Sequence, residues 1–229
     1  MLETLLEAFR QALDLILRGD PEVVSITLRS VFVSGLATIM ACAWGLPFAV
    51  LLGLSSFRGK RLVRSVFNAL LGIPTVALGL VFYLLFSRSG PLGVFQLLYT
   101  PLGMAIGESV LVAPIVISFA SGTIESTDVQ LRDLARTLGA SNLQTSVAIV
   151  REAISGVFLA IVASFNRAIA ELGIALMIGG NIRYVTRMLT TAIALEAAMG
   201  EIAISISLGI ILMIIVFSIT VVLNLFRRT

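Results

Sequence analysis

Two uncharged runs constrain the fold of this chain more than any other feature. Residues 31–54 and 202–226 are stretches of 24 and 25 residues without a single charged side chain. An α-helix needs roughly 20 predominantly apolar residues to cross a bilayer. Each run is therefore long enough to span a membrane as one helix, and the chain is predicted to be an integral membrane protein.

The composition and three further segments extend this prediction. Hydrophobic residues make up 58% and charged residues 13% of the chain, against roughly 45–50% and 25% in ordinary soluble domains. Residues 65–87 carry no charge, residues 101–124 carry only Glu108, and residues 153–182 carry only Arg167 and Glu171. We therefore predict an all-α polytopic membrane protein, with residues 1–229 as one transmembrane domain. Its five transmembrane helices are expected at 31–54, 65–87, 101–124, 153–182 and 202–226.

Basic residues gather on one side of the predicted spans. The nine on this side are Arg58, Lys60, Arg61, Arg64, Arg132, Arg136, Arg151, Arg227 and Arg228. The loops on the other side carry three, Arg88, Arg183 and Arg187. Because cytoplasmic loops carry the excess of Lys and Arg, the richer side is predicted to be cytoplasmic, with the C-terminus. Five spans then place the N-terminus outside.

Residues 1–19 are predicted to form an amphipathic helix ahead of the first span. One face carries an apolar stripe, which consists of Leu2, Leu5, Leu6, Phe9, Leu13, Ile16 and Leu17. Such a helix is typical of a membrane interface, and packing of the stripe on the transmembrane bundle is the alternative. Gly19 is expected to end this helix, and Asp20 as cap with Pro21 at the first helical position begins the next one.

The most polar internal segment lies between the third and fourth spans, at residues 123–152. Thr127 precedes Gln130 by three residues and Ser141 precedes Gln144 by three, so each pair can form a capping box at a helix start. Gly139 lies between them, where a left-handed backbone conformation can end the first helix. The segment is therefore predicted to form two short helices joined at Gly139, as a rigid cytoplasmic knob.

The fourth span combines a packing face with two charges. Small residues recur every four positions at Gly156, Ala160, Ser164 and Ala168, which lets another helix approach closely. Arg167 and Glu171 are spaced to pair within one helix turn. They are interpreted either as a buried ion pair that joins helices or as a polar element beside a substrate path. Glu108 in the third span either joins this network or faces an aqueous cavity.

Three prolines are predicted to interrupt spans, at Pro47, Pro74 and Pro114. In a transporter such breaks can line a cavity or act as hinges. In any helical membrane protein they can equally be packing kinks.

No enzyme chemistry is visible in the sequence. The chain has no histidine and one cysteine, Cys42, which excludes His/Cys metal sites, cysteine–histidine nucleophile pairs and disulfides. Gly53 to Lys60 differs from a phosphate loop, because five residues separate its glycines and Arg61 replaces the Ser/Thr. We expect no cofactor, and if ATP drives this protein, hydrolysis occurs on another polypeptide.

The polar segment resembles the cytoplasmic coupling loop of ABC importer permeases. That signature reads Glu-Ala-Ala, three residues, Gly, nine residues, Ile, and the positions that match its spacing are Asp133, Ala135, Gly139 and Ile149. Leu134 departs from the second position, and Asp133 shortens the acid. The resemblance identifies these four residues as candidates for coupling to an ATPase.

Two further stretches resemble the oxyanion branch of these permeases, the molybdate, tungstate and sulfate systems. The first comprises Arg167, Glu171, Gly173, Gly179-Gly180-Asn181, Tyr184, Thr186-Arg187 and Thr190-Thr191. The second, Ser87 to Gly93 followed by Tyr99-Thr100-Pro101, is similar to the external loop of tungstate permeases in particular.

The resemblance implies a type I ABC importer permease-like fold in the inner membrane. It also implies a homodimer, two cytoplasmic ATPase subunits, an external substrate-binding protein and no nucleic-acid partner. The expected cargo is tungstate or molybdate, with sulfate or phosphate as alternatives. An ion-coupled secondary transporter is one alternative, but it would usually show internal repeats and ionisable relays, and this chain shows neither a clear repeat nor any histidine. A non-transporting scaffold is the other, and it would leave Arg167 and Glu171 with a packing role alone.

Overall fold

The computed structural model describes residues 2–226, except for the side chains at positions 2–5, 8, 12, 128–133, 136, 223, 224 and 226. Arg227, Arg228 and the side chain of Asp133, which the sequence analysis singled out, lie outside the described residues.

Every regular element among residues 2–226 is a helix. In chain order they are α1 (Leu2–Arg18), α2 (Pro21–Leu54), α3 (Lys60–Leu70), α4 (Thr75–Phe86), the 3₁₀ helix η1 (Gly93–Phe95), α5 (Pro101–Thr137), α6 (Asn142–Glu152), α7 (Ile154–Ile169), α8 (Gly173–Gly179), α9 (Leu189–Ala198) and α10 (Ile202–Phe226). Within this described part, three helices are long and apolar enough to cross a membrane, or up to five if each of two bent helix pairs is counted as one span.

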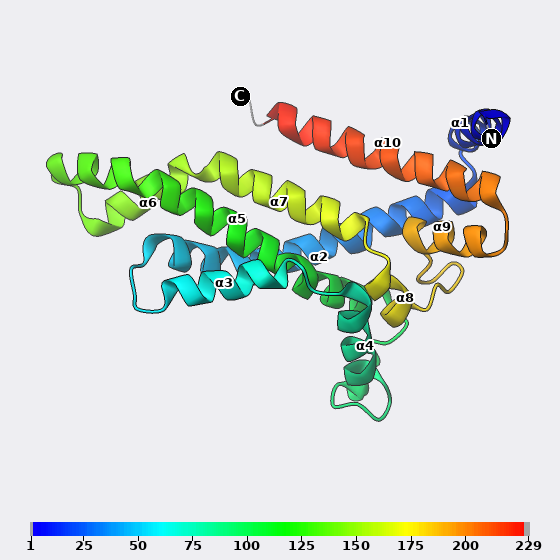
Figure 1. The fold of residues 1–229 in the computed structure, drawn as a ribbon, viewed down its shortest axis with the longest axis horizontal. Coiled ribbons are helices and arrows are strands. Elements are labelled where there is room, and N and C mark those ends of the chain that lie inside the picture. Colours follow the sequence, from blue (N-terminus) through cyan, green and yellow to red (C-terminus); the bar gives the residue numbers. More distant parts are fainter. Residues whose placement is uncertain (1, 227–229) are drawn as a thin grey trace.

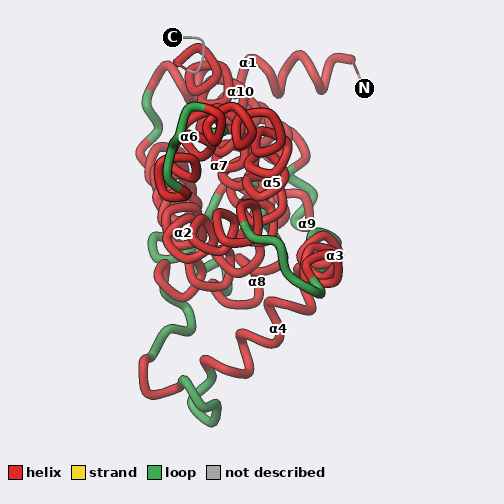
Figure 2. The backbone as a smooth tube through the Cα atoms, turned by 90° about the vertical axis from the view of Figure 1, so that its left-hand side faces the viewer, coloured by secondary structure: helices red, strands yellow, loops and turns green. Residues whose placement is uncertain are grey.

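The long helices follow the long axis of the molecule (Figure 1). α2 packs along α5, α5 packs against α7, and α10 contacts α1 and α9. α6 and the end of α5 lie at one end of this axis, and α9 lies at the other. The view along the axis in Figure 2 shows α4 projecting away from the bundle.

The start of the chain folds as its turn residues predict. Gly19 has a φ of +61°, and the Asp20 carboxylate accepts hydrogen bonds from the amides of Glu22 and Val23 at 3.0 Å. α1 contacts α10, yet Phe9, Leu13 and the other described stripe residues stay exposed. The stripe is thus free to face a membrane interface, and its place at that surface stays a prediction.

The second predicted span, 65–87, is two helices rather than one. α3 and α4 meet at an angle of 93°. Gly72 and Ile73 form tight turn bonds back to Ala69 and Leu70, and Pro74 follows without an amide to continue the helix. The break predicted at Pro74 is therefore confirmed, and the pair is either one broken span or a re-entrant loop.

The fourth predicted span, 153–182, is also broken. α7 ends at Ile169 and α8 begins at Gly173. A Cβ atom at Gly173 would lie 2.6 Å from Thr75 Oγ1 and 2.8 Å from Val76 N, so this glycine lets the start of α4 approach α8. The region after it, read as an external loop, contains the helix α9 (Leu189–Ala198).

The third span continues past its predicted end. α5 runs without interruption to Thr137, through Pro114, and Pro47 likewise lies inside the continuous helix α2. The interruptions predicted at Pro47 and Pro114 are therefore wrong. Thr127 lies inside α5 and does not begin a helix. Its hydroxyl donates to the carbonyl of Thr123 at 2.9 Å within α5. The predicted first short helix of the polar segment is thus the end of a transmembrane helix.

The small-residue face of α7 packs as predicted. Ala160, Ser164 and Ala168 are buried. A Cβ atom at Gly156 would lie 2.2 Å from Cγ2 of Thr123 on α5, and the Thr123 hydroxyl is itself bonded to the Phe119 carbonyl at 3.0 Å. Gly156 therefore sets how closely α5 and α7 approach each other.

Replacing this glycine should separate the two helices. We expect Gly156→Val to lower the free energy of unfolding by about 1–3 kcal/mol, the usual cost of overpacking, measured by thermal unfolding in detergent. Gly122→Val is the matched control, since no atom lies within 4 Å of a Cβ built at Gly122. Equal destabilisation by both changes would contradict the role of Gly156.

Candidate functional site

The turn between α5 and α6 has a defined geometry. Gly139 has a φ of +75°, and the amide of Ala140 donates to the carbonyl of Ala135 at 2.9 Å, which is the long bond of a Schellman motif. Ser141 then caps α6: its Oγ accepts from the Gln144 amide at 3.3 Å, and Gln144 Oε1 accepts from the Ser141 amide at 2.8 Å. The structure thus contains the predicted glycine turn and the second capping box.

α6 has one face against the protein and one face away from it. Ile149 is fully buried and packs with Ile124 of α5 and with Ala153. Leu143 and Val147 on the same helix are exposed. Of the four predicted coupling residues, Gly139 shapes the turn, Ala135 supplies the carbonyl that closes it, and Ile149 holds α6 in place. The fourth, Asp133, lies on α5.

Arg167 and Glu171 form an ion pair at the break between α7 and α8. Arg167 Nη1 lies 2.7 Å from Glu171 Oε2. Glu171 Oε1 accepts from the amide of Ile174 at 3.0 Å, and the Glu171 carbonyl accepts from Thr190 Oγ1 at 2.8 Å. The Glu171 side chain is 2% exposed and that of Arg167 37%. Glu171 therefore joins α7, α8 and α9, while Arg167 presents a cation at the surface of the single chain.

Glu108 is fully buried in α5, close enough to Arg167 and Glu171 to interact with their charges. Neither of its carboxylate oxygens has a hydrogen-bond partner among the described residues. The structure therefore does not bring Glu108 into the Arg167–Glu171 ion pair. The carboxylates of Glu108 and Glu171 are therefore both near the guanidinium group of Arg167.

A loop at the other end of the molecule, residues 180–188, is held by bonds that the sequence did not predict, although Tyr184 and Arg187 fall in the stretch that resembles oxyanion permeases. Arg29 of α2 donates to the carbonyls of Tyr184 and Arg187, both at 2.9 Å, and Glu22 pairs with Arg183 and Arg187. Within α2, the pattern that could have indicated these bonds is that Glu22 and Arg29, seven residues apart, share one face of a helix.

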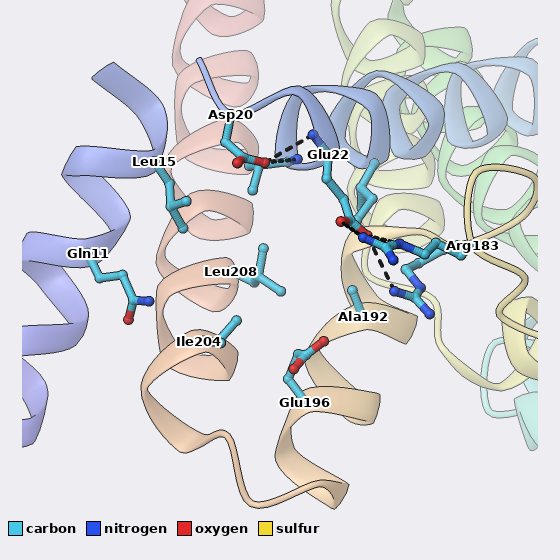
Figure 3. Close-up of a pocket in the computed structure, with 12 residues that line it drawn as sticks. Gln11, Leu15, Asp20, Glu22, Arg183, Ala192, Glu196, Ile204 and Leu208 are labelled. Atoms are coloured by element: carbon cyan, nitrogen blue, oxygen red, sulfur yellow. Dashed lines mark hydrogen bonds and ion pairs between the residues drawn. The ribbon is translucent and has the colours of Figure 1, made fainter. Parts of the chain in front are cut away.

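Figure 3 shows Glu22 between the start of α2 and this loop, in a pocket of about 380 Å³. The hydrogen bond to Glu22 and the charge of Glu22 raise the pKa of the exposed Arg183. The ion pair fixes the loop to α2.

Comparison with known proteins identifies the family of this chain. The family described as the binding-protein-dependent transport system inner membrane component matches residues 45–229. The chain belongs to this family.

Two relatives of this inner membrane component are similar over nearly the full chain. The tungstate uptake system permease protein TupB of Peptoclostridium acidaminophilum is 40% identical over 222 residues, which covers 97% of each chain. The protein of the same name from Campylobacter jejuni is 34% identical and covers 100% of this chain and 95% of its own. Permeases named for sulfate and molybdenum match at 31% and 29% over about three quarters of the chain.

The fold of this inner membrane component is that of a solved importer. The MetNI methionine ABC transporter aligns with a TM-score of 0.72 at 19% sequence identity, over 90% of this chain and 95% of the other. The predicted all-α fold, like that of type I ABC importer permeases, is thereby confirmed. So is the resemblance to ABC permeases that the sequence motifs suggested.

The ion pair at the α7–α8 break can be tested by comparing single and double variants. We expect Arg167→Met to destabilise the protein by about 3–5 kcal/mol, because it leaves the buried Glu171 carboxylate unpaired. Arg167→Met/Glu171→Leu should recover most of this loss. About 1–3 kcal/mol should remain, because the Ile174 amide then lacks its acceptor. Denaturant unfolding in detergent measures both, and a double variant no more stable than Arg167→Met would contradict the pairing.

Proposed function

We propose that this chain is the membrane-spanning subunit of an ATP-driven, binding-protein-dependent importer of tungstate. The observation that carries this proposal is the 40% identity to a tungstate permease over 97% of both chains. The more distant match to molybdenum and sulfate permeases supports an oxyanion as the general class of cargo. Molybdate, with the same charge and tetrahedral shape, is the second candidate.

The coupling role belongs to the turn at Gly139 and to α6. An ATPase subunit needs a rigid element to push against, and this turn is fixed by the Schellman bond, the Ser141 cap and the buried Ile149. Leu143 and Val147 are left exposed and provide an apolar contact surface. We propose that each chain offers this one surface to one separate ATPase subunit, which hydrolyses the ATP.

The exposure of Arg167 favours a homodimer. Arg167 lies about 20 Å along α7 from its start, at 1.5 Å per residue, and a charge at such depth in lipid costs about 2.5–3.5 kcal/mol. Its side chain is 37% exposed in the single chain, so a second copy or an aqueous path must face it. A two-fold dimer would bring both Arg167 residues toward one axis. We propose that this axis is the anion path, fed by an external binding protein at the 180–188 loop.

Reconstitution tests the proposed activity. Liposomes that contain this chain and its ATPase should accumulate radioactive tungstate from a solution that holds the binding protein. Accumulation should require ATP on the side of the membrane where the ATPase lies. Excess molybdate should compete better than sulfate. Uptake driven by an ion gradient without ATP would contradict the proposal, and preferential uptake of molybdate or sulfate would reassign the cargo.

The same assay tests the coupling turn. Gly139→Val should abolish most ATP-dependent uptake while the protein stays folded, because a β-branched residue disfavours the left-handed conformation that the turn requires. Gly139→Asn is the matched control, since Asn tolerates this conformation, and it should retain uptake. Normal uptake and ATPase binding by Gly139→Val would show that coupling lies elsewhere.

The anion path can be separated from simple packing with the double variant of the ion pair. If Arg167 offers the anion a positive surface, Arg167→Met/Glu171→Leu should restore stability but not uptake. Full uptake by this variant would leave the pair a structural role alone.

We also propose that the N-terminus lies outside and the C-terminus in the cytoplasm, on the basis of the charge distribution. In a background without Cys42, single cysteines at the exposed positions Ser89 and Ser141 should react with an impermeant thiol reagent from opposite sides, Ser89 from the outside. Reaction of both from one side would contradict the five-span topology.

A further inference from the structure

A basic pocket lies where the chain turns from α2 into α3. It has a volume of about 410 Å³ and is lined by Ser56, Phe57, Gly59, Lys60, Arg61, Arg64 and Glu125. Three cationic side chains and one carboxylate line it, so its walls carry a formal net charge of +2. Arg58 lies in the chain between the lining residues Phe57 and Gly59 and adds another positive charge to this turn. This pocket is separate from the coupling turn and from the ion pair of Arg167.

The carboxylate in the pocket is already engaged. Glu125 Oε1 lies 3.3 Å from Lys60 Nζ, and Arg64 forms a second ion pair with the same carboxylate. Lys60 also donates to the carbonyl oxygens of Gly53 and Ser55, at 3.3 and 2.9 Å. Lys60 and Arg64 are therefore held in place as part of the fold.

Two guanidinium groups are not engaged in this way. Arg58 and Arg61 are both exposed, and neither has a hydrogen bond or an ion pair with any residue that the structure describes. Glu125, bonded to Lys60 and Arg64, does not neutralise them. They offer planar, multidentate donors of the kind that bind phosphate.

An apolar surface leads away from these charges along α3. No residue of α3 is buried, and the side chains that it exposes at helical spacing include Leu62, Val66 and Leu70. Leu62 lies next to Arg61 at the start of the helix, and the other two follow one and two turns further on. A cationic region thus continues into an apolar strip. This combination suits a molecule with an anionic head and an apolar tail better than it suits a free anion.

We propose that this pocket binds the phosphate of an anionic phospholipid, whose acyl chains lie along the exposed face of α3. Arg58 and Arg61 contact the phosphate, while Lys60 and Arg64 keep the pocket positive. A lipid with a choline headgroup carries its own cation and is bound less well. On the orientation proposed above the lipid belongs to the cytoplasmic leaflet, and only this leaflet assignment rests on the proposed function.

Lipid binding to the full purified chain tests this directly. Native mass spectrometry in detergent should show phosphatidylglycerol retained in preference to phosphatidylcholine. The variant Arg58→Gln/Arg61→Gln should lose about 30-fold in apparent affinity for phosphatidylglycerol, because each basic residue near an anionic lipid contributes about fivefold. Arg58→Lys/Arg61→Lys keeps the charge and should lose far less.

Arg88→Gln is the matched control, since it removes one exposed arginine from the far end of the α3–α4 pair and should leave lipid binding unchanged. Inorganic phosphate at millimolar concentration should not displace the lipid, and displacement would identify a site for a free anion. If the unmodified chain retains phosphatidylcholine as well as phosphatidylglycerol, the proposal is overturned and no variant is needed to show it. Unchanged phosphatidylglycerol binding by a folded Arg58→Gln/Arg61→Gln would also overturn it. None of these outcomes depends on tungstate transport.

Discussion

The carboxylate of Glu171 holds together the least regular part of the transmembrane region. Inside a bilayer, a broken helix is stable only if its free backbone groups find partners. Glu171 supplies an acceptor for the Ile174 amide, binds Arg167 and receives a hydrogen bond from Thr190 on its own carbonyl. Three helices therefore meet at one residue, and the position of Arg167 at the protein surface follows from this arrangement.

Much of the fold could be predicted because its signals are local. The uncharged run at 202–226 coincides with α10. Asp20 and Ser141 cap helices through their side chains, and Gly139, without a Cβ, takes the left-handed turn. The proline at position 74 marked the break in the second span, whereas the end of α7 at Ile169 was harder to predict, because residues 153–182 contain no proline to mark it. Thr127 misled the prediction, since a capping pattern in sequence does not reveal that the preceding helix continues.

The candidate site was only partly predictable for the same reason. The i,i+4 spacing correctly indicated that Arg167 pairs with Glu171, but it could not show that the helix ends between them. The loop at 180–188 depends on bonds from Arg29 to residues 155 and 158 positions away, and no pattern within one segment encodes such a pairing. The burial of Glu108 without a hydrogen-bond partner among the described residues likewise depends on how α5 is surrounded.

The continuity of α5 has a mechanical consequence. This helix spans 37 residues, about 55 Å at 1.5 Å per residue, and it carries Glu108 in its first third and the Gly139 turn just beyond its end. Because α5 is unbroken through Pro114, it can act as a lever arm. A tilt of about 5° would move one end by about 5 Å relative to the other over that length. A small tilt at the Gly139 end would therefore become an ångström-scale rearrangement near the buried charges.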